Sequence, residues 1–171
     1  MIDAMSNVKA LLVVTEPETF TRNQSGSVVG RIYLRLDGEY FPDNQWFDFP
    51  VPVLSWWMES LLRVLTGQQT ECELLFMDGP QFLHLAASSP DVWSVAFLRD
   101  STDRRPEPPF SPEEPNRHKE GVQHEYEISA KPFMNSLLET AGVVIEECGK
   151  RDWHSQDIDE LGRLRERLLA L

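Results

Sequence analysis

The hydrophobic and polar positions of the chain change period along its length, and the clearest helical pattern lies near the middle. Apolar side chains there recur at spacings of three and four residues, with polar side chains on the opposite face. The apolar positions are Leu54, Trp57, Met58, Leu61, Leu62 and Leu65. Pro50 and Pro52 fit only at or before a first helical turn, and Gly67 suits the left-handed position after a last one. The pattern predicts a helix from about Val51 to Thr66.

Two more helices are predicted in the C-terminal part of the chain. Pro132 opens the first, which runs to about Cys148 with Gly149 as its stop. The other begins at Asp157, because Asp157 and Glu160 have the spacing of a capping box. The apolar stripes of the two helices are Phe133, Leu137, Leu138, Ala141, Val144, Ile145 and Cys148, and then Ile158, Leu161, Leu164 and Leu168.

Six segments combine short apolar or alternating patterns with turn residues at their ends, as strands do. They are Val8–Thr15, Val28–Leu36, Glu71–Met77, Gln81–Ala87, Val92–Leu98 and Val122–Ile128. The short turns between the third, fourth and fifth segments predict an antiparallel meander. We therefore expect an α+β fold, in which an antiparallel sheet of about six strands carries three packed helices. The length of 171 residues fits a single domain.

The segment from Asp100 to Gly121 interrupts this pattern. It contains five prolines and a single aromatic residue among many charged ones, so it buries too little surface to offset the entropy of ordering. We interpret residues 100–121 as a disordered insertion. Pro112 to Arg117 also fits a loose proline-rich ligand pattern, which leaves a role in peptide recognition open.

The net charge narrows the class of partner. Twenty-eight acidic and sixteen basic residues give a formal charge of −12. This balance argues against direct binding to nucleic acid or to an anionic membrane, and it favours encounter with a basic protein, although it also serves ordinary solubility. No apolar run approaches the roughly 18 residues of a membrane span, and the first residues lack the apolar core of a signal peptide. We expect a cytoplasmic protein.

Residues with catalytic or metal-binding chemistry are few. The four histidines lack the spacing of a zinc site, and Cys72 and Cys148 are more typical of small buried core residues. His84 lies within a predicted strand, where a structural role is expected. Cys148 with His154 is conceivable as a nucleophile and base, but Cys148 falls on the buried stripe of its helix. We therefore predict no catalytic residue, no metal site and no cofactor.

An aromatic and acidic segment precedes the central helix. Its carboxylates include Glu39, Asp43 and Asp48, and its aromatic residues include Tyr40 and Trp46. One interpretation is a loop that lines the core, in which the aspartates form turns and cap the helix. The other is a recognition surface, because tryptophan and tyrosine are favoured at binding hot spots and carboxylates select basic partners.

Two stretches resemble the immunity proteins of bacterial polymorphic toxin systems. They are GEYFPDNQWFDFP, followed by LSWW, and FMDGP at Phe76 to Pro80. The resemblance implies a protein that binds a cognate toxin domain, commonly a basic nuclease or another nucleic-acid-modifying enzyme, and occludes its active site. It assigns no role to any individual residue.

The leading hypothesis is thus a non-catalytic inhibitor of a basic toxin. Glu39, Asp43 and Asp48 would enter a basic groove, with Tyr40 or Trp46 as the hydrophobic anchor. A second hypothesis is an enzyme or small-molecule-binding domain with a pocket between sheet and helices, recognisable by a deep pocket holding two or more polar groups of perturbed pKa. A third is a scaffold protein of a bacterial assembly, with residues 100–121 as its peptide ligand.

Overall fold

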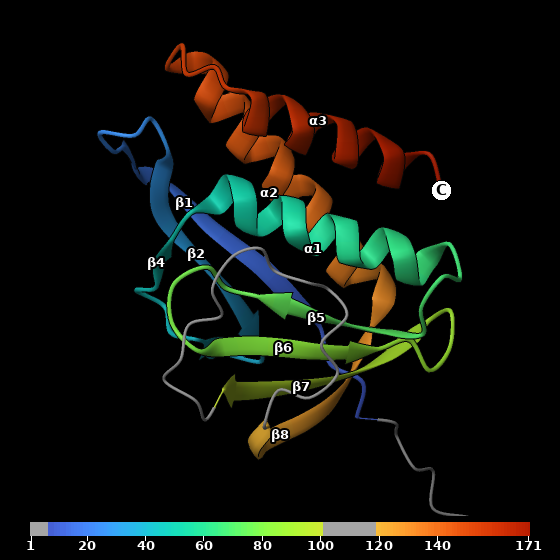
Figure 1. Ribbon diagram of the computed structural model, residues 1–171. Helices are drawn as coiled ribbons and strands as arrows, with labels where there is room; N and C mark the ends of the chain where they lie inside the picture. The colour runs from blue at the N-terminus through green and yellow to red at the C-terminus, as the bar shows by residue number, and fades with distance from the viewer. Residues whose placement is uncertain (1–6, 101–118) are drawn as a thin grey trace, which may run out of the picture.

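The computed structural model describes residues 7–100 and 119–171, which form three helices and two four-stranded antiparallel sheets packed into one compact body (Figure 1). The first sheet contains β1 (Leu11–Arg22), β2 (Val28–Leu36), β3 (Glu39–Phe41) and β4 (Phe47–Asp48). The second contains β5 (Glu71–Leu75), β6 (Gln81–Ala86), β7 (Val92–Asp100) and β8 (Lys119–Ser129), in that order across the sheet. The helices are α1 (Pro50–Leu65), α2 (Ala130–Lys150) and α3 (Gln156–Leu169).

The α+β class and the three helices are confirmed, but the described strands number eight in two sheets instead of about six in one. The additional strands are β3 and β4, which arise from the aromatic and acidic segment. Both pair with the same edge of β2, while β1 pairs with its other edge. Strands of three and two residues are too short to show an alternation in the sequence.

The two sheets meet at Lys9. The Lys9 N–H donates to the Glu127 carbonyl at 2.8 Å, and the Lys9 carbonyl accepts from the Ser129 N–H at 3.0 Å. Lys9 thereby forms a parallel bridge with Ile128 in β8 just before β1 begins. The chain thus pairs with the edge strand β8 of the second sheet at Lys9 and then enters β1 of the first sheet.

Strand β1 is longer than predicted. The sequence places its end near Glu16 and Pro17, yet pairing with β2 resumes at Thr21 after an irregularity in the register. The Arg151 guanidinium supports this irregular stretch, because it donates to the Phe20 carbonyl at 2.6 Å and to the Pro17 carbonyl at 2.9 Å. The proline is thus accommodated inside a strand by contacts from Arg151, the residue that follows α2.

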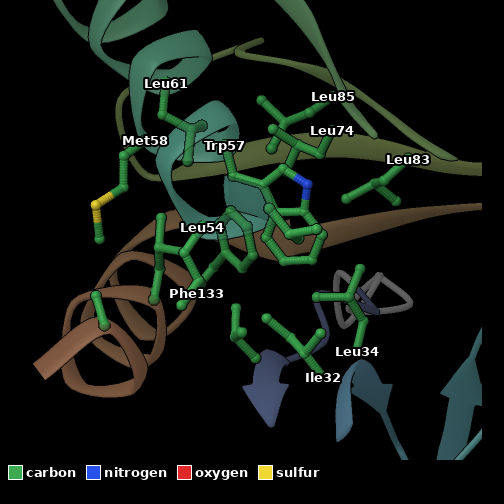
Figure 2. Close-up of a cluster of buried hydrophobic side chains, with 14 of the residues drawn as sticks. Ile32, Leu34, Leu54, Trp57, Met58, Leu61, Leu74, Leu83, Leu85 and Phe133 are labelled. Atoms are coloured by element: carbon green, nitrogen blue, oxygen red, sulfur yellow. The ribbon is translucent and has the colours of Figure 1, made fainter. Parts of the chain in front are cut away.

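The three helices gather on one side of the sheets (Figure 1). Helix α1 packs against β5 and α3, and α2 packs against β1 and α3. The Trp57 ring of α1 is fully buried at the centre of the core, and its Nε1 donates to the Leu75 carbonyl at 2.7 Å. Figure 2 shows side chains from several elements around it, including Ile32, Leu34, Leu74, Leu83, Leu85 and Phe133.

The helix ends correct three details of the prediction. Leu65 belongs to the predicted apolar stripe of α1 but is exposed in its last turn. Helix α2 passes through Gly149, and the left-handed residue after its end is Asp152, with φ of 56°. The cap of α3 is Ser155 instead of Asp157, because the Ser155 hydroxyl accepts from the Ile158 N–H at 3.3 Å.

Part of the predicted insertion can be compared with the structure. Its first residue, Asp100, ends β7, and residues 119–121 begin β8, so both ends belong to strands. The prediction for residues 101–118 lies outside the described residues. Among the described helices, none combines the length and the apolar character that crossing a membrane requires.

Candidate functional site

Asp48 connects the aromatic and acidic segment to the second sheet. Its side chain is 1% exposed, so it is not available to a partner as the sequence predicted. Its Oδ1 accepts from the Phe49 N–H at 2.8 Å, and its Oδ2 accepts from Trp46 Nε1 at 3.1 Å. The same Oδ2 accepts from the N–H groups of Met77 and Asp78, at 3.1 and 3.2 Å. Four donors therefore hold one carboxyl between two loops.

Burial raises the pKa of the Asp48 carboxyl above its usual range, because the ionised form loses its hydration. Hydrogen bonds from the Phe49 N–H, the Trp46 indole and the Asp78 N–H lower the pKa in part. The nearby Asp78 carboxylate adds a smaller rise. Asp48 is therefore a structural group whose ionisation is disfavoured by its surroundings.

An open hollow lies above Asp48. The loop before β4 and the turn between β5 and β6 meet there, since Asp48 binds the backbone of that turn. The lining residues are Asp43, Asn44, Gln45, Trp46, Phe47 and Asp78. Two predicted site residues, Asp43 and Trp46, therefore share one surface feature.

Trp46 forms a wall of the hollow in a fixed orientation. Its Nε1 is bonded to Asp48, and its ring meets the Phe76 ring edge-on with centroids 6.1 Å apart. Its far end lies against Gly79, where an added Cβ would be 2.8 Å from Cη2. Because Gly79 has φ of +81°, both the conformation and the space at this turn favour glycine. The indole is therefore ordered before any partner arrives.

Two carboxylates border the hollow from opposite loops. Asp43 Oδ1 accepts from the Gln45 N–H at 2.8 Å, which fixes that side chain in an Asx turn. Asp43 and Asp78 are both exposed, and within the described residues neither forms an ion pair. Asp43 and Asp78 therefore each place a carboxylate at the rim of the hollow.

Glu39 and Tyr40 lie apart from the hollow and on opposite faces of the first sheet, because neighbouring strand residues alternate. Tyr40 pairs with Arg35 on the face turned away from the helices, and its ring meets Tyr33 edge-on at 5.7 Å. Glu39 Oε2 accepts from the Tyr126 hydroxyl at 3.4 Å. The five predicted site residues thus do not form one patch.

Phe47 lines the hollow and also belongs to the outer face that carries Tyr40. It is 45% exposed, and the Arg31 guanidinium carbon lies 5.6 Å from its ring centroid. Arg31 is in turn paired with Glu16 at 2.7 Å. The sequence pattern assigned no role to Phe47. It missed Asp78 because the contact between this turn and the loop around Asp43 leaves no signal in the sequence.

The remaining candidates for chemistry are dispersed. Both cysteines are free and buried, and burial raises the pKa of each thiol, to about 12 for Cys72. His84 Nε2 lies 3.3 Å from Glu71 Oε2, and the exposed His154 lies 2.8 Å from Asp152. Within the part of the chain described, no three His, Cys, Asp or Glu side chains are grouped to hold a metal ion.

Comparisons of the chain with protein families, with curated proteins and with solved structures found no match.

Proposed function

We propose that this protein is a non-catalytic binding protein that recognises a basic protein through the hollow above Asp48. The observation that carries the proposal is that Asp43 and Asp78, two exposed carboxylates from separate loops, line one hollow together with Trp46 and Phe47. Neither carboxylate forms an ion pair with any residue that the structure describes. Aromatic anchors bordered by carboxylates are well suited to a basic surface. The formal charge of −12 would accelerate the encounter.

The rigidity of the hollow supports a role in binding. Asp48 and Phe76 hold Trp46, and an Asx turn holds Asp43. A surface ordered in advance loses less conformational entropy on association. Phe47 extends this surface toward Tyr40, which is 43% exposed on the same face of the first sheet.

The resemblance to immunity proteins suggests the biological setting. In this setting the partner is a toxin domain with a basic substrate groove, and the surface around the hollow covers that groove. Of the residues expected to contact the partner, Asp43, Trp46 and Tyr40 keep that role in the proposal. Asp48 instead holds the turn after β5 through the Met77 N–H, and Glu39 accepts from the Tyr126 hydroxyl of β8.

The experiment is affinity purification from the source cells with the tagged full chain, washed at low salt and then at about 0.5 M salt, where surface electrostatics are heavily screened. The test variant carries Asp43→Lys and Asp78→Lys. The control carries Glu139→Lys and Glu166→Lys, which make the same charge change at exposed helical positions. The proposal predicts one basic protein near equal stoichiometry, retained by the control and lost by the test variant. No basic partner, or equal retention by both variants, would overturn it.

A further inference from the structure

The residues that line the hollow favour one of the two basic side chains over the other. Its lining includes the aromatic side chains of Trp46 and Phe47, and the carboxylates of Asp43 and Asp78 come from two different loops. A guanidinium is planar, stacks on aromatic faces and offers five donors in a rigid fork. An ammonium is a compact, strongly hydrated charge with weaker stacking.

We propose that the hollow receives an arginine side chain of the partner, with its guanidinium beside Trp46 or Phe47 and its donors directed to Asp43 and Asp78. This inference rests on the proposed function and names the group that is recognised. Carboxylates on two loops can accept from different edges of one guanidinium, whereas one ammonium offers a less directional contact.

Two features of the chain support this choice. Phe47 already contacts a guanidinium within the chain, since the Arg31 Cζ lies 5.6 Å from the ring centroid. The exposed Asn44 and Gln45 add side-chain amides to the lining, which can accept from guanidinium N–H groups that the carboxylates leave free. The negative charge, the aromatic side chains and the number of acceptors therefore favour one ligand group.

The test is a titration of the full-length, isotopically labelled protein with N-acetyl-arginine amide, followed by the indole N–H signal of Trp46 and the backbone N–H of Asp78. N-acetyl-lysine amide and the uncharged N-acetyl-citrulline amide are the comparison ligands. The expected result is a saturable shift of both signals with the arginine derivative. The lysine derivative should bind about threefold more weakly or worse, and citrulline should cause no saturable shift.

Variants locate the binding. Asp43→Asn with Asp78→Asn removes two charges at nearly constant size and should abolish saturation, whereas Glu139→Gln with Glu166→Gln should leave it unchanged. Equal binding of the lysine derivative, or saturation that survives in the hollow variant, would overturn the inference. If arginine fails while the basic partner is still lost by the charge-reversed hollow, this inference is wrong and the proposed function stands. If the arginine derivative binds but no partner is captured, the preference of the hollow for a guanidinium stands and the proposed function is wrong.

Discussion

Asp48 accepts a hydrogen bond from the backbone N–H of Asp78 at 3.2 Å, although the two residues lie thirty positions apart. This bond and the one from Met77 place the turn after β5 beside the loop before β4. The hollow exists because of that placement, since Asp43 comes from one loop and Asp78 from the other. The buried Asp48 carboxyl thus holds together the two loops that form the hollow, although Asp48 is not one of the residues that line it.

Removing the Asp48 carboxyl should destabilise the protein strongly. Asp48→Ala leaves four N–H donors without their acceptor at a partly buried position. We expect a loss of about 3 kcal/mol or more in the free energy of unfolding, measured with urea. Asp43→Ala is the matched control, because within the described residues its exposed carboxylate accepts one hydrogen bond, from the Gln45 N–H. This variant should cost about 1 kcal/mol or less. Similar values for both variants would contradict the role of Asp48.

The contribution of Asp48 should depend on pH. Burial raises its pKa in the folded state above the usual 3.8. As the pH rises past that value, the unfolded chain releases the proton first, so this group contributes less stability until the folded carboxyl is also ionised. Asp48→Asn cannot titrate. The difference in unfolding free energy, wild type minus Asp48→Asn, should therefore fall as the pH rises from about 4 to 7. A constant or rising difference would show that burial does not govern this carboxyl.

Gly79 should be sensitive to substitution because of Trp46. Gly79→Ala introduces a Cβ 2.8 Å from Cη2 of Trp46 and 2.7 Å from Oε1 of Gln81, at a φ of +81°. Gly38→Ala has the same φ, and its added Cβ meets no neighbouring atom of the described residues within 4 Å, so it measures the backbone strain alone, about 1 kcal/mol. We expect Gly79→Ala to cost about 1–3 kcal/mol more than this control. It should also shift the Trp46 indole signal, which Gly38→Ala should not do.

Arg151 should not tolerate replacement by lysine. Its guanidinium bonds two carbonyls of β1 and the Glu147 carboxylate at 2.9 Å at the same time. Lysine cannot reproduce this fork, so Arg151→Lys should lower the unfolding free energy by about 2 kcal/mol. Arg163→Lys, at an exposed pair with Glu160, should change it by about 0.5 kcal/mol or less. Equal effects in thermal or urea unfolding would contradict this role of Arg151.

Both thiols should be unreactive in the folded protein. Burial raises the pKa of Cys148, and raises that of Cys72 to about 12. Very little nucleophilic thiolate is then present at pH 8, and the thiols are inaccessible. Ellman's reagent should label neither cysteine in the native protein and both in urea. Rapid native labelling would place a thiol at the surface, against the structure.

Local patterns in the sequence predicted the helices and the longer strands. The stripe from Leu54 to Leu62 is buried as expected, and β2 has the predicted bounds. The short strands β3 and β4 left no periodic signal, and the extension of β1 past Pro17 depends on Arg151, far away in the sequence. Such features are set by tertiary contacts, which composition and spacing do not encode.

The candidate site was predicted in part. Three of the predicted residues, Tyr40, Asp43 and Trp46, are on or near the surface, where a partner could reach them. Asp48 instead fits the other interpretation of the segment, because its buried side chain stabilises the fold. Alternation along β3 sends Glu39 and Tyr40 to opposite faces, a consequence of strand formation that the sequence did not indicate. Asp78 enters the site only because Asp48 binds its backbone.

Hydrogen exchange of the full chain, alone and with the captured basic partner, tests whether the hollow above Asp48 is the binding surface. We expect new protection in two segments together, around Asp43 to Phe47 and around Met77 to Gly79, with the exposed faces of α2 and α3 unchanged. Protection confined to those helices, or to only one of the two loops, would contradict the claim that the hollow above Asp48 is the binding surface.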